Sequence, residues 1–452
     1  MDDYVLAFVM AGGRGSRLKI LTKHRTKPAV SMLGQYRIFD FVGTNIANSG
    51  IPAMIIAAQF EPQSLLKHIG NGRVWGFDGL DKRIEFNHPH ERDGNLIRFK
   101  GTADSVRKSM DRISRHNPRI VLVLGGDHVY AMNYKEVIKQ HKLNNADVTI
   151  MANPVTEEKV KSFGLMKVDE SGRITEFTEK PKEKEVIERF RLSERVKNSL
   201  GIDEKYDFLA SMGNYVFFKD RLESFLNNYQ KNDFGNHIIP KVKEAGGSLY
   251  AYPFNGYWRD VGQVGDYFDC NMDFISGSAP IDLTKHRVRT TGRHLPGPRI
   301  ARNAIAKSSI LSNGDEISSG SELINCVLGY QVVVGEDCKL KDSIILGGDK
   351  NQYHNNKLRD YNASFVGKGS VVERVIFDKN VKIGSNVNIS PENGTPEERI
   401  SKLKKIGLKP YREKEGRVEG DFYFEKERGI LVLGKRARSK KEELAIPDGF
   451  EG

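Results

Sequence analysis

Cysteine is scarce in this chain of 452 residues, which has only Cys270, Cys326 and Cys338. No two of them have the C-x-x-C spacing that zinc sites and redox motifs use. A disulfide-stabilised secreted scaffold is also disfavoured by so few cysteines. We therefore expect a protein of a reducing compartment, the cytoplasm.

Long apolar runs are absent too. The longest, at residues 5–11 and 120–126, are far shorter than the roughly 20 residues that cross a bilayer. The first run follows two acidic residues and ends in Gly-Gly, which is typical of a strand and not of a secretion signal. We expect no membrane partner.

Acidic residues are outnumbered, because 71 Lys and Arg stand against 59 Asp and Glu and leave a net charge of +12. Such an excess fits a nucleic acid, a membrane surface or anionic small substrates, and composition does not choose among them. No basic face interleaved with aromatic residues is present, so we expect no nucleic-acid partner. At about 100–200 residues per domain, the length predicts two or three domains.

The first part of the chain has the pattern of an α/β layer. Amphipathic stretches such as 105–115 and 133–145 lie between short β-rich runs. This alternation predicts a largely parallel sheet in a domain over residues 1–275. Residues 276–300 are rich in Gly, Pro, Ser and Arg and have neither helical nor strand period, so we interpret them as a linker. The β-rich runs are 5–11, 51–58, 120–126, 147–153 and 214–218.

After the linker, aliphatic residues recur about every six positions. A hexapeptide period with one inward aliphatic residue per short face predicts a parallel β-helix, here over 301–435 with a polar insertion at 348–364. A β-sandwich with coincidental spacing is the alternative. We expect residues 436–452, which begin with a basic run, to be a solvated charged tail. The aliphatic positions are Leu311, Ile317, Leu323, Leu328, Val334, Leu340, Leu346, Val366, Val372, Ile383 and Ile389.

A glycine-rich loop follows the first predicted strand, with Gly12, Gly13 and Gly15 around Arg14. Such loops expose backbone N–H groups that bind phosphate oxygens. Residues 14–27 also carry six Lys and Arg and no acidic residue. The spacing matches neither G-x-G-x-x-G nor the P-loop. A plain structural turn is the alternative, but the cations favour binding of a polyphosphate.

Two aspartates follow hydrophobic segments that are far apart in the sequence. Asp127 comes directly after the run at 120–126, and Asp260 follows the segment 249–254. Open α/β sheets bind ligands at the carboxyl ends of their strands, and carboxylates are ligands that Mg²⁺ prefers. The pair predicts a shared Mg²⁺ site, although either residue alone could be a turn or helix cap.

The chain resembles the ADP-glucose pyrophosphorylases (glucose-1-phosphate adenylyltransferases) from Val5 to about Ile389. The motifs that carry the resemblance, in order, are AGGRGSRL, KPAV, YRIFDF, GTAD, GGDHVY, EKP, LASMGNYVF, NDFGNHIIP and YWRDVG. The resemblance implies a Rossmann-like, mostly parallel nucleotidyltransferase domain followed by a left-handed parallel β-helix. It also implies transfer of the adenylyl group of ATP to glucose 1-phosphate for glycogen or starch synthesis, allosteric control, and a homotetramer or a hetero-oligomer with a related subunit.

The resemblance also implies roles for individual residues. Arg14, Arg17 and Lys27 would contact the phosphates of ATP, with Asp127 as the fourth catalytic residue, and Gly12, Gly13 and Gly15 would form the nucleotide loop. Gln59, Gly101 and Thr102 would face the base, and Asp127 and Asp260 would hold Mg²⁺. Glucose 1-phosphate would bind to Gly164, Glu179, Lys180 and Ser211. Arg25 and Arg37 match positions near the family's effector site.

The chain also departs from the family pattern. Asn214 stands where an aliphatic residue usually follows SMG, and Phe99-Lys100 stands where Tyr-Arg is common. Three other hypotheses are a non-catalytic regulatory subunit, an enzyme for another nucleoside triphosphate or sugar phosphate, and an acyltransferase that works through the β-helix. The regulatory subunit is disfavoured because the phosphate loop and the aspartates are intact, and the acyltransferase because no histidine stands among the hexads.

Overall fold

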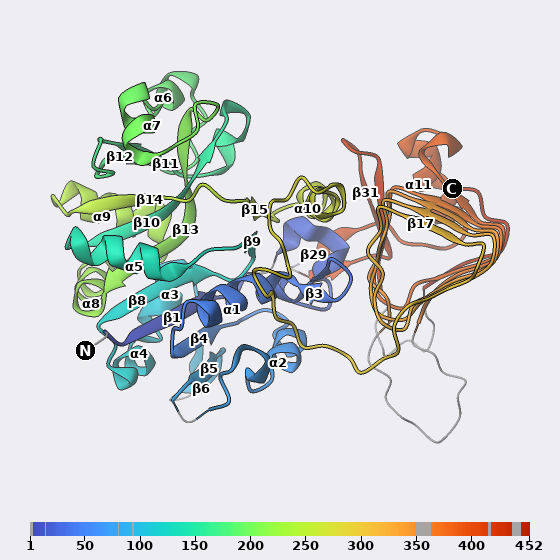
Figure 1. Cartoon of the computed structure of the whole chain (residues 1–452), viewed down its shortest axis with the longest axis horizontal. Helices are drawn as coiled ribbons and strands as arrows, with labels where there is room; N and C mark the ends of the chain where they lie inside the picture. Colours follow the sequence, from blue (N-terminus) through green and yellow to red (C-terminus); the bar gives the residue numbers. More distant parts are fainter. Residues whose placement is uncertain are drawn as a thin grey trace.

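The computed structural model describes residues 3–13, 15–79, 81–92, 95–348, 363–414, 417–435 and 444–452. An α/β domain and a β-helix lie side by side, and a long irregular segment passes between them and joins them (Figure 1). That segment covers residues 277–298, which contain no helix or strand. The linker predicted at 276–300 therefore agrees with the structure to within two residues.

The α/β domain is built on a nine-stranded sheet. Its central strand β1 (Val5–Met10) pairs in parallel with β4 (Ala53–Ala57) and β8 (Ile120–Gly125). The long strand β13 (Phe208–Phe218) runs antiparallel to β8 and to β10 (Val148–Val155), so the sheet is mixed. The other strands of this sheet are β5 (Arg83–Asn87), β11 (Leu165–Val168), β12 (Ile174–Thr178) and β14 (Leu249–Pro253). Small two-stranded sheets are formed by β2 (Ser31–Met32) with β3 (Tyr36–Arg37), β6 (His90–Arg92) with β7 (Asn95–Ile97), β9 (His128–Tyr130) with β15 (Trp258–Asp260), and β29 (Arg412–Lys414) with β30 (Arg417–Glu419).

Both faces of this sheet are buried. Along β1, Leu6 and Phe8 belong to one hydrophobic cluster, and Ala7 and Val9 belong to another. Successive side chains of a strand point to opposite faces, so helices must cover both sides of the sheet. Those of this domain are α1 (Ile38–Asn48), α2 (Gln63–Ile69), α3 (Thr102–Arg107), α4 (Met110–His116), α5 (Tyr134–Leu143), α6 (Lys184–Glu188), α7 (Glu194–Leu200), α8 (Lys219–Asn228), α9 (Ile239–Glu244) and α10 (Val264–Ser276).

The hexads form a parallel β-helix with three stacked faces. All the predicted aliphatic positions except the partly buried Leu311 are at most 4% exposed. Most of them pack in one hydrophobic cluster inside the β-helix, which confirms their inward orientation. Leu346 is the exception, because it packs in the cluster shared with the α/β domain, and its neighbour Ile345 packs inside the β-helix instead. The first face stacks β16 (Arg299–Ile300), β18 (Glu316–Ile317), β21 (Val332–Val334), β24 (Ser364–Val366), β27 (Lys382–Ile383) and β33 (Ala445–Ile446). The second stacks β17 (Ile305–Lys307), β19 (Glu322–Ile324), β22 (Lys339–Lys341), β25 (Val371–Glu373) and β28 (Asn388–Ile389). The third stacks β20 (Val327–Leu328), β23 (Ile344–Ile345), β26 (Val375–Phe377) and β32 (Ile430–Leu433), with β31 (Phe422–Glu425) at its edge.

The prediction of a solvated tail over 436–452 is wrong for its last nine residues. Strand β33 pairs in parallel with β27, and Leu444 and Ile446 are each 1% exposed. The apolar residues of this short segment cover the end of the β-helix, so the domain continues beyond the predicted boundary at 435. The basic run at 436–443 and most of the polar insertion, 349–362, lie outside the described residues. Helix α11 (Pro396–Lys405) precedes this last part of the chain.

A buried carboxyl group supports one corner of the β-helix. Asp315 is 1% exposed and accepts hydrogen bonds from the backbone N–H groups of Ser312 (2.7 Å) and Val332 (2.9 Å). Burial penalises the charged form and raises the pKa of Asp315 to about 7, although both hydrogen bonds oppose the shift.

The two domains share a hydrophobic cluster. Leu18 and Leu21, which follow the glycine-rich loop, pack in the same cluster as Val327 and Ile376 of the β-helix. At the same interface, the buried guanidinium of Arg25 pairs with the buried carboxylate of Asp378 at 2.8 Å. The β-helix therefore contacts the segment that immediately follows the predicted phosphate loop.

Candidate functional site

The glycine-rich loop leaves the carboxyl end of β1. Its first residue, Ala11, is held by the carbonyl of Ala57 (2.8 Å) and by the hydroxyl of Thr26, which donates to the carbonyl of Ala11 (3.0 Å). Gly15 has a φ of +64°, and a Cβ atom there would lie 2.9 Å from the Cβ of Lys27. Around Gly13, in contrast, a Cβ atom would meet no protein atom within 4 Å. The fold therefore requires glycine at position 15 and leaves the backbone at position 13 accessible to a ligand. Arg14 lies outside the described residues.

Asp127 and Asp260 meet as the sequence predicts. Asp127 follows β8, and Asp260 ends β15, which pairs with β9 so that Asp260 lies opposite His128. The ammonium group of Lys27 lies between the two carboxylates, 2.9 Å from Asp127 and 2.8 Å from Asp260. Lys27 is 5% exposed. Three residues far apart in the sequence thus form one charged cluster beside the glycine-rich loop.

The charges in this cluster stabilise one another. Burial opposes the ionised form of Lys27, but the two carboxylates outweigh it and raise the pKa of the ammonium group. Burial likewise opposes ionisation of Asp127 and Asp260, and Lys27 then lowers the pKa of both carboxyl groups. All three groups are therefore charged at neutral pH.

The donor set of this cluster fits a divalent cation. Asp127, His128 and Asp260 each offer a ligand atom, and these atoms lie within 4.8 Å of one another. Mg²⁺ prefers carboxylate oxygens, whereas an imidazole nitrogen suits softer metals. The two aspartates therefore match the predicted Mg²⁺ site, in which Mg²⁺ itself stays a prediction.

A pocket of about 190 Å³ opens next to Asp260. It brings together all four residues that the resemblance assigns to glucose 1-phosphate, namely Gly164, Glu179, Lys180 and Ser211. A Cβ atom on Gly164 would lie 2.5 Å from a carboxylate oxygen of Glu179, so a larger residue there would displace that carboxylate from its present position. Burial raises the pKa of Glu179, and the half-exposed ammonium of Lys180, 3.6 Å away, opposes the shift.

Phe163, Asp233 and Trp258 also line this pocket, although no role was predicted for them from the sequence. The ring of Trp258 packs against Phe163, with centroids 4.8 Å apart, and against His128 at 5.5 Å. Asp233 accepts hydrogen bonds from the hydroxyl of Thr102 (3.1 Å) and from the backbone of Asn236 (2.8 Å). All of these residues line the pocket. Trp258 and Asp233 lie within the quoted YWRDVG and NDFG motifs, which were the available signal.

Of the three residues predicted to face the base, Thr102 lines the pocket just described, whereas Gln59 and Gly101 do not. The amide of Gln59 donates to the carbonyl of Phe99 (3.1 Å) and accepts from its N–H group. A Cβ atom on Gly101 would lie 2.3 Å from the carbonyl of Asn232, which requires glycine there. Gln59 also lies beside Gly12, whose Cβ atom would be 3.6 Å from that of Gln59. The structure thus ties the segment 99–102 to the glycine-rich loop, whereas contact with a base stays a prediction.

The remaining predicted arginines have different surroundings. Exposed Arg17 lies near Gly262, where a Cβ atom would be 3.5 Å from both its guanidinium and a carboxylate oxygen of Asp260. Arg25 forms the interdomain pair described above. Arg37 donates to the carbonyls of Ala29 and Ser64, each at 3.1 Å. Arg17 therefore lies near Asp260, whereas its contact with ATP and the effector role of the other two arginines stay predictions.

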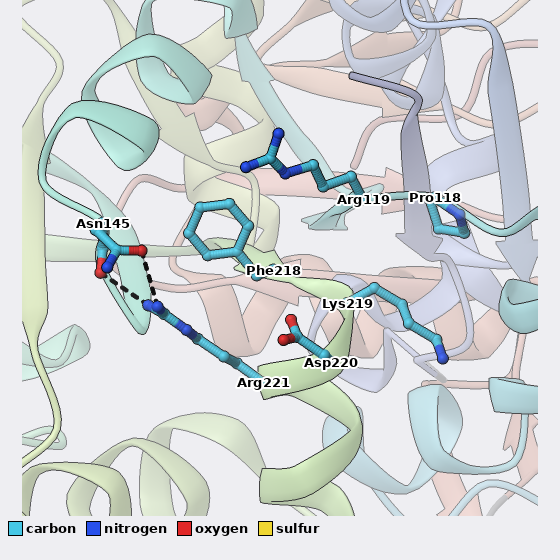
Figure 2. A pocket seen from close by; sticks show the side chains of 7 residues that line it. All are labelled: Pro118, Arg119, Asn145, Phe218, Lys219, Asp220 and Arg221. Atoms are coloured by element: carbon cyan, nitrogen blue, oxygen red, sulfur yellow. Dashed lines mark hydrogen bonds between the residues drawn. The ribbon is translucent and has the colours of Figure 1, made fainter.

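A second pocket, of about 340 Å³, lies where β8 begins and β13 ends (Figure 2). Arg119, Lys219 and Arg221 line it, but each pairs with an acidic group: Asp3, Glu223 and Asp147, respectively. The guanidinium of Arg221 also donates to Asn145 (Figure 2). Because its cations are already neutralised and it lies at the opposite end of β8 from Asp127, this pocket is not part of the candidate site.

Comparisons with known proteins agree with this geometry. Residues 6–277 match the family model "Nucleotidyl transferase", and residues 293–406 match the model "GLGC left-handed parallel beta-helix domain". The chain is therefore a nucleotidyltransferase joined to a left-handed parallel β-helix. No helix among the described residues is long and apolar enough to cross a membrane.

Two curated relatives define the family more closely. A glucose-1-phosphate adenylyltransferase of Acetivibrio thermocellus is 33% identical over 454 residues, which cover 99% of this chain and 91% of the relative. Another, of Clostridioides difficile (strain 630), is 37% identical over 356 residues, covering 76% of this chain and 86% of the relative. The chain belongs to the glucose-1-phosphate adenylyltransferase family.

Proposed function

We propose that this protein transfers the adenylyl group of ATP to glucose 1-phosphate, giving ADP-glucose and pyrophosphate for glycogen or starch synthesis. The observation that carries the proposal is the convergence of Lys27, Asp127 and Asp260 between the glycine-rich loop and the pocket of Glu179 and Lys180. The glycine-rich loop and this pocket provide separate places for the two anionic substrates, and the charged cluster lies between them.

The reaction needs positioning and charge stabilisation more than a base. An oxygen of the sugar phosphate attacks the α-phosphorus of ATP, and pyrophosphate leaves. No side chain has to remove a proton, because glucose 1-phosphate is ionised at neutral pH. Backbone N–H groups of the glycine-rich loop would hold the triphosphate, and Lys180 would bind the sugar phosphate. Holding both substrates in line supplies much of the acceleration.

Lys27 stabilises negative charge at the point where it develops. Its position against Asp127 and Asp260 keeps it protonated, so it would offer a fixed cation to the departing pyrophosphate. We propose that Asp127 and Asp260 hold Mg²⁺, which when bound would neutralise phosphate oxygens. Arg17 would contribute a further cation from beside Gly262.

The proposal also covers the compartment, the oligomeric state and the regulation of the enzyme. We propose a cytoplasmic homotetramer, or a hetero-oligomer with a related subunit, whose activity responds to an effector near Arg25 and Arg37. The family resemblance supports these points.

Pyrophosphate release tests the function directly. The purified protein is incubated with glucose 1-phosphate, Mg²⁺ and each nucleoside triphosphate in turn, with Asp127→Asn as the matched inactive control. We expect release with ATP and at least a hundredfold lower kcat in the control. Release with UTP or GTP in place of ATP would overturn the nucleotide assignment. No release with any triphosphate, alone or with a related subunit, would favour a regulatory subunit.

A further inference from the structure

Asn214 lies at an irregular point of β13, behind the turn that carries Asp127. The preceding residue, Gly213, has a φ of +66°, and the register of β13 with β10 shifts opposite this segment. Pairing of β13 with β8 reaches Tyr215 and Val123, two residues short of Gly125. At Gly125 the backbone N–H donates instead to the side-chain carbonyl of Asn214, at 2.7 Å.

The amide nitrogen of Asn214 binds a residue that follows the turn. The Nδ2 atom of Asn214 donates to the hydroxyl of Tyr130 (3.2 Å), which also hydrogen-bonds the hydroxyl of Tyr134 (2.6 Å). Asn214 therefore connects Gly125, which precedes Asp127, with Tyr130, which follows it. Both Asn214 and Tyr130 are completely buried.

A second asparagine, Asn45, binds the backbone that follows the turn and also contacts the linker. Asn45 donates to the backbone carbonyl of Tyr130 (3.1 Å), and its side-chain oxygen accepts from the N–H group of Met132 (3.1 Å). The same oxygen contacts the Nε2 atom of His286 in the linker at 2.8 Å. The turn at Asp127 is thus held from both flanks by polar side chains inside an otherwise apolar core.

We propose that Asn214 is a positioning residue for the carboxylate of Asp127. It holds the backbone of Gly125 before Asp127 and the side-chain hydroxyl of Tyr130 after it, and so sets where that carboxylate meets Lys27 and Asp260. An aliphatic side chain at position 214 would leave the Gly125 N–H group and the Tyr130 hydroxyl without this partner. The inference rests on the proposed function, because it assigns Asp127 to the reaction centre. Groups that orient the ligands of a metal typically change metal affinity or activity by about 10- to 100-fold.

The test compares Asn214→Leu with the wild type and with a matched control. Asn271 is also completely buried, and its amide likewise accepts from a backbone N–H group (Leu33, 2.9 Å) and donates, to the carbonyl of Tyr267 (2.8 Å). Asn271→Leu should therefore cause a similar loss of thermal stability at a distance from Asp127. Asn214→Asp, which keeps an oxygen acceptor for Gly125, is the conservative variant.

Two readouts are measured: Mn²⁺ binding by electron paramagnetic resonance in the presence of ATP, and steady-state kinetics. We expect Asn214→Leu to weaken Mn²⁺ binding and to lower kcat by about tenfold or more, with the KM for glucose 1-phosphate within about twofold of wild type. Asn214→Asp should recover part of both losses, and Asn271→Leu should leave both within about twofold of wild type. Equal effects of the two leucine variants, or unchanged Mn²⁺ binding in Asn214→Leu, would overturn the proposal.

The readouts also separate this proposal from the proposed function. If the wild-type protein releases no pyrophosphate with any nucleoside triphosphate, the proposed function fails, while Mn²⁺ binding still decides the role of Asn214. If Asn214→Leu does not fold, the comparison is made with Asn214→Asp and Tyr130→Phe, which remove the donor and the acceptor of the Asn214–Tyr130 hydrogen bond, respectively. Weaker Mn²⁺ binding and a lower kcat than wild type in both variants would support the proposal. Mn²⁺ binding and kcat within twofold of wild type in both variants would overturn it.

Discussion

Replacing Lys27 with methionine should both weaken the fold and remove activity, and the two effects should respond differently to divalent cations. The variant removes the ammonium group that lies between Asp127 and Asp260. The two carboxylates then face each other without an internal counter-charge. With oxygen atoms up to 4.8 Å apart and an effective dielectric constant of about 20, their repulsion is about 3 kcal/mol.

The carboxylates are partly accessible, with 34% and 22% of their side chains exposed, so water reduces that repulsion. We expect Lys27→Met to lower the free energy of unfolding by about 2 kcal/mol in a chelating buffer. A few millimolar Mg²⁺ should restore most of this loss, because it supplies the missing positive charge to the same carboxylates. The kcat should stay at least about a hundredfold below wild type, since no cation replaces Lys27 beside the leaving group.

Urea unfolding with and without Mg²⁺, together with pyrophosphate release, measures these effects. Lys197 offers a matched control, because it is also buried and pairs with two carboxylates, Glu194 (3.1 Å) and Asp207 (3.3 Å), outside the pocket. Lys197→Met should lose stability that Mg²⁺ does not restore, and should keep its kcat. A Lys27→Met protein with wild-type stability in chelator, or with wild-type kcat, would refute the reasoning.

Three further predictions concern the interface, the β-helix and the loop. Arg25→Met leaves the buried carboxylate of Asp378 without its ion-pair partner and should lower the free energy of unfolding in urea by about 3 kcal/mol. Recovery of stability in the double variant with Asp378→Leu checks that the loss comes from this unpaired charge. Burial raises the pKa of Asp315 to about 7, so the stability that its protonated form contributes is fully present below pH 4 and is lost as the pH rises through about 7. Thermal unfolding should therefore show about 1.4 kcal/mol less stability at pH 9 than at pH 6. Asp315→Asn should lack this pH dependence. Gly15→Ala should destabilise the protein by about 1–2 kcal/mol, whereas Gly13→Ala should leave the melting temperature unchanged and raise the KM for ATP.

The sequence predicted those parts of the fold that have a strong period. One inward aliphatic residue per face, as at Val334 and Leu340, leaves few alternatives to a β-helix, and all the predicted positions except Leu311 are buried, although Leu346 packs against the α/β domain. The tail was mispredicted because its charged residues outweigh Leu444 and Ile446 in composition, although these two side chains decide its packing. Short apolar segments at a chain end have no period from which their burial could be inferred.

The proximity of site residues could be predicted from the sequence where these residues directly follow strands. Asp127 and Asp260 were paired because the carboxyl ends of strands share one edge of a sheet. The place of Lys27 between them depends on how residues 16–30 fold back, which no local pattern indicates. The role of Asn214 depends on an irregular strand and on the backbone of another strand, so the sequence marked it only as a departure from the family pattern.

The central claim is that an oxygen of glucose 1-phosphate attacks the α-phosphorus of ATP at this site. Following the phosphate oxygens of glucose 1-phosphate into the products tests this claim most directly. Glucose 1-phosphate labelled with ¹⁸O at its peripheral phosphate oxygens is incubated with unlabelled ATP and Mg²⁺, and the products are analysed by mass spectrometry. We predict that the label appears entirely in ADP-glucose and that the pyrophosphate is unlabelled. Label in the pyrophosphate, or the absence of ADP-glucose, would contradict the account.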